Sequence, residues 1–131
     1  MRTYLVDGTN AVRRGAWDPR FPEMEEVRTE GFLHKLSTLA AGAAGRIEVE
    51  VFFDGPRRPF RVVPGAPVRL RFTIDGDADA AILGSARRLL DSGRGVVVVT
   101  EDSGLAGEVR EEGGRSMRIG EFLRRLDGGT A

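Results

Sequence analysis

The sequence predicts an α/β fold with a mostly parallel sheet and helices on both sides of it. Short apolar runs that suit buried strands alternate along the chain with amphipathic segments that suit helices. The run at 96–99 consists of four valines, which indicates a strand buried on both faces, as in the centre of a parallel sheet. The 131 residues are expected to form one domain, residues 1–131.

The individual elements follow from periodicity and from the positions of proline. Apolar side chains recur at helical spacing after Pro22, and a proline suits the first turn of a helix. Four prolines at 55–67 predict a loop, and strict alternation at 68–72 predicts an edge strand with one wet face. In chain order we expect a strand at 3–7, helices at 10–17 and 23–44, a strand at 47–53, the loop, the edge strand, a helix at 78–90, a strand at 95–100, a helix at 103–112, a short strand at 115–119 and a helical turn at 121–126.

Three of the predicted strands deliver an aspartate at their carboxyl end. Asp7 follows the first strand, Asp54 the second and Asp102 the valine-rich strand. Ligands of open α/β sheets bind outside the carboxyl ends of the strands, so we expect these three acids to meet at one edge. The start of the helix expected at 78–90 offers a fourth acid, from Asp75, Asp77 or Asp79.

Converging carboxylates would give this edge a definite chemistry. They repel one another, so without a cation at least one would keep its proton to raised pH. The chain has no cysteine, and its one histidine, His34, lies in the middle of a predicted helix. Ligands that are all oxygens favour Mg²⁺ or Mn²⁺ over zinc. Such a site suits the hydrolysis of phosphodiester bonds.

Each acid also has a structural interpretation. Asp7-Gly8 and Asp54-Gly55 are common turn dipeptides, and the second is also typical of hairpins. Asp102 suits the N-cap of the helix that follows it. The coincidence of three acids at one expected edge, rather than any single acid, favours the functional interpretation.

Composition excludes several classes of function and bounds the partners. The 20 acidic and 20 basic residues balance, so a nucleic-acid ligand would need a local basic patch. The position of His34 disfavours a Ser-His-Asp triad, and the absence of Gly-x-Gly-x-x-Gly and P-loop motifs disfavours dinucleotide or nucleotide binding. The lack of cysteine, of a long apolar run and of a signal-like start fits a cytoplasmic protein without membrane contact.

Several polar and basic residues are candidates for contact with substrate at the same edge. The polar ones suit helix caps equally well, and solvent exposure alone accounts for at least half of the arginines. The candidates are Asn10, Arg14, Arg57, Arg58, Thr100 and Ser103, and the wider basic surface adds Arg13, Arg61, Arg69 and Arg71.

Four motifs in this order resemble the PIN-like nucleases, and within them the NYN branch and its YacP-like proteins. The motifs are LVDGTN at 5–10, VFFDG at 51–55, DADAAI at 77–82 and VVTEDS at 98–103. The strand end at 71–73 and the segment at 117–123 are also similar to YacP-like proteins, so the resemblance covers nearly the whole chain.

The resemblance implies a Rossmann-like three-layer fold and an endoribonuclease that uses Mg²⁺ or Mn²⁺. Carried over by position, Asp7, Asp54, Asp79 and Asp102 are the catalytic and metal-binding acids, with Asn10 beside them. The expected partner is RNA, with the ribosome and a homodimer as further possible assemblies. The alternative is a catalytically silent RNA- or ribosome-binding module of the same fold. A receiver-like module ranks last, because Lys35, the only lysine, is not at a strand end.

Overall fold

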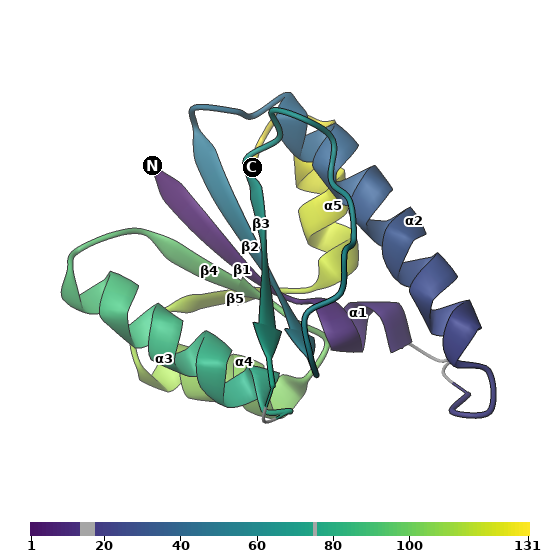
Figure 1. Ribbon diagram of the computed structural model, residues 1–131. Helices are drawn as coiled ribbons and strands as arrows, with labels where there is room; N and C mark the ends of the chain where they lie inside the picture. The colour runs from purple at the N-terminus through teal and green to yellow at the C-terminus, as the bar shows by residue number, and fades with distance from the viewer. Residues whose placement is uncertain (14–17, 75) are drawn as a thin grey trace.

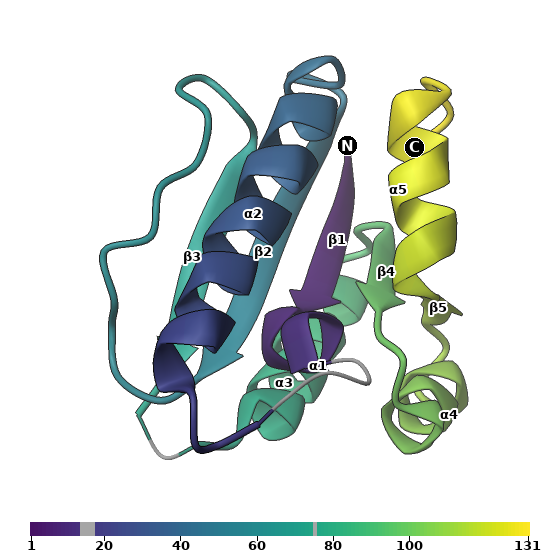
Figure 2. The same cartoon turned by 90° about the vertical axis from the view of Figure 1, so that its right-hand side faces the viewer.

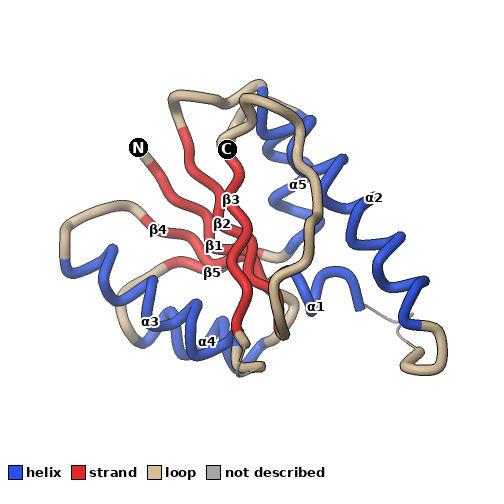
Figure 3. Tube along the Cα trace, viewed as in Figure 1, coloured by secondary structure: helices blue, strands red, loops and turns tan. Residues whose placement is uncertain are grey.

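The computed structural model describes residues 1–13, 18–74 and 76–131, and it contains a five-stranded sheet with helices on both faces (Figures 1 and 3). All strand pairs of this sheet are parallel, in the order β3-β2-β1-β4-β5. The elements are β1 (Arg2–Asp7), α1 (Gly8–Arg13), α2 (Pro22–Ala41), β2 (Ile47–Asp54), β3 (Val68–Thr73), α3 (Ala78–Asp91), β4 (Val96–Val99), α4 (Ser103–Glu111), β5 (Arg115–Met117) and α5 (Ile119–Asp127).

Two apolar layers hold the helices on the sheet. Alternate residues along β1 point to opposite faces, so Tyr4 and Val6 pack under α2 and α5, whereas Leu5 packs under α3 and α4. Figure 2 shows α1, α2 and α5 in front of the sheet, with α3 behind it. Tyr4 stacks on Phe122 of α5 with ring centroids 4.6 Å apart, which fixes the last helix against the central strand. The structure therefore confirms the predicted α/β/α layering.

The strands confirm the sequence patterns that predicted them. The four valines of β4 are all buried, and β4 lies between β1 and β5 as a continuous apolar run requires. β3 alternates in burial and forms one edge of the sheet. Because β3 runs parallel to β2, the hairpin alternative for Asp54-Gly55 is wrong, and the chain instead crosses back through the loop at 55–67.

Helix ends differ from the predictions by a few residues. α1 begins at Gly8 rather than 10, and residues 14–17 of the helix expected there lie outside the described residues. α2 ends at Ala41 rather than 44, because the chain turns there to lead into β2. α5 begins at Ile119, where the partly buried Glu101 side chain accepts a hydrogen bond from the backbone N–H of Ile119.

The strand order reverses beside β1, which places a topological switch point between β1 and β4. β2 and β3 follow on one side of β1, whereas β4 and β5 follow on the other. The loops that leave β1 and β4 therefore diverge, and a crevice opens at their carboxyl ends. None of the helices in the described parts of the chain combines the length and hydrophobicity needed to cross a membrane.

Candidate functional site

Asp7 ends the central strand β1 directly at the switch point. The residue is only 4% exposed. One carboxylate oxygen, Oδ1, accepts a hydrogen bond from the backbone N–H of Asn10 at 3.3 Å. The other, Oδ2, accepts one from the hydroxyl of Thr100 at 3.2 Å. Two fixed donors on separate elements thus hold this carboxylate in one orientation.

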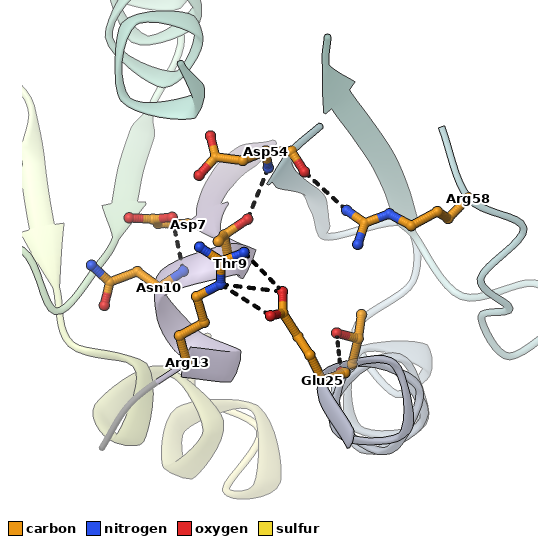
Figure 4. Close-up of polar contacts among 8 residues, drawn as sticks. Asp7, Thr9, Asn10, Arg13, Glu25, Asp54 and Arg58 are labelled. Carbon is orange, nitrogen blue, oxygen red and sulfur yellow. Dashed lines mark hydrogen bonds and ion pairs between the residues drawn. The ribbon is translucent and has the colours of Figure 1, made fainter. Parts of the chain in front are cut away.

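Gly8 and Thr9 join the end of β1 to the end of β2. A Cβ atom on Gly8 would lie 2.7 Å from side-chain atoms of both Val51 and Phe53, so only glycine lets α1 start this close to β2. The Thr9 hydroxyl oxygen then accepts a hydrogen bond from the backbone N–H of Asp54 at 2.8 Å (Figure 4). Thr9 is thus a positioning residue that was not among the predicted site residues, because its partner Asp54 lies 45 residues away in the sequence.

Asp54 ends β2 and caps the helix that carries the next acid. Its Oδ1 accepts a hydrogen bond from the backbone N–H of Ala78 at 3.0 Å, at the start of α3. Asp77 is the N-cap of the same helix and accepts from the N–H of Ala80 at 2.9 Å. Asp79 therefore lies in the first turn of α3, beside Asp54, as the resemblance implied.

Asp102 is both the N-cap of α4 and a neighbour of Asp7. Its Oδ1 accepts hydrogen bonds from the backbone N–H groups of Gly104 and Leu105, at 2.8 and 3.2 Å. The Thr100 hydroxyl oxygen accepts a hydrogen bond from the backbone N–H of Asp102 at 3.0 Å, and the same hydroxyl donates a hydrogen bond to Asp7. Thr100 thus couples the end of β4 to the end of β1, and the cap interpretation of Asp102 is confirmed.

All four acids line one cleft at the carboxyl end of the sheet. Its volume is about 570 Å³, and it is lined by Asp7, Thr9, Asn10, Arg13, Asp54, Gly76, Asp77, Ala78, Asp79 and Asp102. Within the described ranges, Arg13 is the one cationic side chain on its wall. The structure therefore brings together the four predicted acids, and Asp77 adds a fifth carboxylate to the lining.

The pKa values of two of these acids reflect this concentration of charge. The pKa of Asp7 is raised to about 6, chiefly by burial and further by the negative charges of Asp79 and Asp54, against the opposing hydrogen bonds from Asn10 and Thr100. The pKa of Asp79 is raised by partial burial and then by the charges of Asp102 and Asp54. A cation in the cleft would relieve both effects.

The carboxylate oxygens of the cleft are the groups that could hold a divalent ion. Across residues 1–13, 18–74 and 76–131, no group of three or more Asp, Glu or His side chains stands ready to ligate one ion directly. One oxygen each of Asp54 and Asp102 already accepts backbone N–H groups. Mg²⁺ takes only one or two carboxylates directly and keeps several waters, so Asp7, Asp54, Asp79 and Asp102 are the residues that could hold such an ion, in part through water.

Of the residues predicted to contact substrate, some lie at the cleft and others do not. Asn10 lines the cleft, and Ser103 is exposed beside Asp102 in a neighbouring pocket. Thr100 is buried, and the contacts of its hydroxyl are the hydrogen bonds that join Asp7 to Asp102. Arg57 is exposed and lies outside the lining of the cleft.

The structure tests only one of the two remaining arginines of that prediction. Arg14 falls outside the described residues. The Arg58 guanidinium packs against the rings of Phe53, Phe60 and Phe72, at 6.0, 5.1 and 5.6 Å from their centroids. Its Nη2 donates to the backbone carbonyl of Asp54 at 3.0 Å (Figure 4), so the visible contacts of Arg58 stabilise the end of β2.

Comparison with known proteins identifies the fold. No protein-family model matches the sequence, and no curated protein matches it by sequence. The crystal structure of Rae1 (YacP) from Bacillus subtilis superposes with a TM-score of 0.69 at 22% identity, over 98% of this chain and 75% of that chain. A point variant of Rae1 gives 0.67 at 22% identity, over 96% and 74%. The chain thus has the fold of the YacP protein Rae1, as the resemblance of its motifs implied.

Proposed function

We propose that this protein is a metal-dependent endoribonuclease that hydrolyses RNA phosphodiester bonds in the cleft at the carboxyl end of the sheet. The observation that carries the proposal is the convergence of Asp7, Asp54, Asp79 and Asp102 on that cleft. Similarity of fold to Rae1 supports a nuclease-type framework and leaves the activity itself to be tested. RNA is the proposed partner, the cytoplasm the proposed compartment, and the ribosome and a homodimer are proposed assemblies.

Mg²⁺ or Mn²⁺ would be held by the four acids. When bound, such an ion polarises the phosphodiester and lowers the pKa of water. Asp7 supplies the fixed carboxylate, because Asn10 and Thr100 hold both of its oxygens. Asp54 and Asp102 each use one oxygen to accept a backbone N–H at the start of a helix, and both residues line the cleft.

Asp79 completes the cluster from the start of α3. It lies in the first turn of α3, is more exposed than Asp7, and lines the same cleft. The raised pKa of Asp7 and Asp79 means that these carboxyls hold protons more readily than ordinary aspartates in the absence of a cation. Divalent ions and protons therefore compete for the same groups.

Cleavage of end-labelled RNA with Mg²⁺ or Mn²⁺ tests this proposal. We expect the wild type to cleave and Asp7→Asn to lose at least a hundredfold in rate, roughly the effect of removing a group that organises charge in the transition state. Asp127→Asn, at the exposed end of α5, is the matched control and should keep full activity. Equal rates for the wild type and Asp7→Asn would refute the proposal.

The second candidate is a catalytically silent module that binds RNA or the ribosome. It is favoured by one observation, namely that Asp54 and Asp102 already accept hydrogen bonds from backbone N–H groups at the starts of α3 and α4. The clustering of these two acids would then follow from the fold alone. This candidate predicts RNA or ribosome binding that survives Asp7→Asn, without turnover that depends on a divalent ion.

A further inference from the structure

A second cavity, which we call the side groove, adjoins the acidic cleft and is formed by α4, β5 and the start of α5. Figure 2 shows these three elements together at the β5 edge of the sheet. The side groove has a volume of about 500 Å³. Asp102 lines both cavities, so a strand that crosses the acidic cleft can continue into the side groove. The lining residues that matter here are Asp102, Ser103, Ala106, Arg110, Ser116 and Arg118.

One side of α4 forms a wall of the side groove along most of the helix. Ser103, Ala106 and Arg110 all line it, and residues three and four apart lie on the same side of a helix. At a rise of 1.5 Å per residue, Arg110 lies about 10 Å beyond Ser103 along the helix axis. Arg110 is therefore placed to meet a phosphate that flanks the reacting one, rather than the reacting phosphate itself.

Ser116 of β5 holds the Arg110 side chain with a neutral group. The Arg110 Nη1 donates a hydrogen bond to the Ser116 hydroxyl oxygen at 2.8 Å. Ser116 is partly buried, whereas Arg110 is exposed. Within residues 1–13, 18–74 and 76–131, the Arg110 guanidinium forms no ion pair with a carboxylate. Its positive charge is thus positioned by the serine without being offset by it.

The other charged side chains of the side groove have partners of their own. The Arg118 Nε lies 3.2 Å from Oε2 of Glu101, and Oε1 of Glu121 lies 3.2 Å from Nη2 of Arg125. An anion that binds Arg118 would compete with a carboxylate. An anion that binds Arg110 would compete with a hydroxyl at most, so Arg110 is the stronger position for a phosphate.

We propose that the side groove receives the RNA strand as it leaves the acidic cleft, with Arg110 binding a flanking phosphate and Ser116 as its positioning residue. The inference rests on the proposed function, since it takes the acidic cleft as the reaction site. A guanidinium presents five N–H donors in a planar fork, so one donor can go to the serine while others meet a phosphate. The competing interpretation is that this pair only joins α4 to β5.

Binding of a short fluorescein-labelled single-stranded RNA, measured by anisotropy at several salt concentrations, separates these interpretations. The measurements use the Asp7→Asn protein with a chelator present, so that binding is read without cleavage. Arg110→Gln removes the charge and keeps an amide donor for Ser116. It should weaken binding roughly tenfold, as expected for loss of a charged hydrogen bond. The slope of log K against log salt should become shallower by about 0.7, the value for one lost phosphate contact on a single strand.

Further variants make the test specific. Arg110→Lys keeps the charge, so the salt slope should stay while part of the affinity is lost. Ser116→Ala should weaken binding without changing the slope, and Ser116→Thr, which keeps a hydroxyl, should bind as the parent does. Arg88 is the matched control, because its Nη2 donates to the Ser85 hydroxyl at 2.9 Å within α3, outside the lining of the side groove. Arg88→Gln should change neither affinity nor slope.

Each result decides one of the claims. Unchanged affinity and slope in Arg110→Gln, or equal losses in Arg88→Gln, would overturn the phosphate site; unchanged affinity in Ser116→Ala would overturn the positioning role. Wild-type cleavage with an unaffected Arg110→Gln would leave the nuclease proposal standing without the phosphate site. Lack of cleavage by the wild type, with the Arg110→Gln losses intact, would do the reverse. Failure of the Asp7→Asn protein to bind RNA even at low salt would overturn the inference.

Discussion

Replacing Asp7 by asparagine should stabilise the metal-free protein at neutral pH and leave its stability unchanged in acid. The pKa of Asp7 is raised from an ordinary value of 3.8 to about 6, chiefly by burial. Below pH 3.8, the pKa taken for Asp7 in the unfolded chain, the carboxyl is protonated in both the folded and the unfolded state. The neutral carboxylic acid and asparagine then contribute nearly equally to the free energy of unfolding. As the pH rises from about 4 to about 6, the unfolded chain releases the proton while the folded protein keeps it, so folded stability falls.

The magnitude follows from the same two pKa values. The difference between 3.8 and about 6 corresponds to at most about 3 kcal/mol of folding free energy lost by the wild type above pH 6. Asparagine removes this loss and keeps the local contacts. Its oxygen can accept from the N–H of Asn10, and its amide can donate to Thr100 Oγ1. We expect a gain of about 1–3 kcal/mol at neutral pH.

Urea denaturation with a chelator present, at intervals between about pH 4 and about pH 8, measures this difference. The free-energy difference between Asp7→Asn and the wild type should grow from near zero to its plateau across that range. Asp127→Asn, on the exposed end of α5, should show no such growth. A difference that stays constant with pH would show that the Asp7 carboxyl does not carry the unfavourable charge inferred from its burial.

Three other changes test how the cleft is built, all by denaturation. Arg58→Ala should cost about 1–3 kcal/mol, because it removes the guanidinium from three rings and from the Asp54 carbonyl, whereas Arg57→Ala should be neutral; equal values would refute the packing role. Gly8→Ala should cost about 1–3 kcal/mol through overlap with Val51 and Phe53, while Gly31→Ala in α2, with nothing within 4 Å, should stabilise by about 0.5–1 kcal/mol. Thr100→Val should cost about 1–3 kcal/mol of folding free energy and raise the pKa of Asp7 further, because the lost hydroxyl donates to that carboxylate and accepts from the N–H of Asp102. Thr100→Ser should keep the wild-type stability and the wild-type pKa of Asp7. A pKa of Asp7 that is unchanged in Thr100→Val would contradict this role.

The sequence predicted the features of the site that depend on strand ends. Asp7, Asp54 and Asp102 each follow an apolar run, and parallel strands bring their carboxyl ends to one edge. The valine run at 96–99 was likewise enough to place β4 inside the sheet. Patterns that act over a few residues and a general topological rule were sufficient for these predictions.

Contacts between distant segments could not be predicted in the same way. Thr9 reaches the N–H of Asp54, 45 residues away, and nothing local marks that partner. Arg58 was predicted to contact substrate from its place after Asp54, but Phe53, Phe60 and Phe72 surround its guanidinium once β2 and β3 pair and the loop folds back. Such contacts follow from the register of the sheet and the path of the loop, which the sequence pattern leaves open.

A thermal titration with Mn²⁺, comparing the wild type with Asp7→Asn, tests most directly whether the four acids share a cation. Preferential binding to the folded protein should raise the wild-type melting temperature progressively, with a stabilisation of about 2.7 kcal/mol when Mn²⁺ reaches a hundred times its dissociation constant. Asp7→Asn should start from a higher melting temperature and respond much less. No shift of the wild type at millimolar Mn²⁺, or an equal shift of both proteins, would contradict the account.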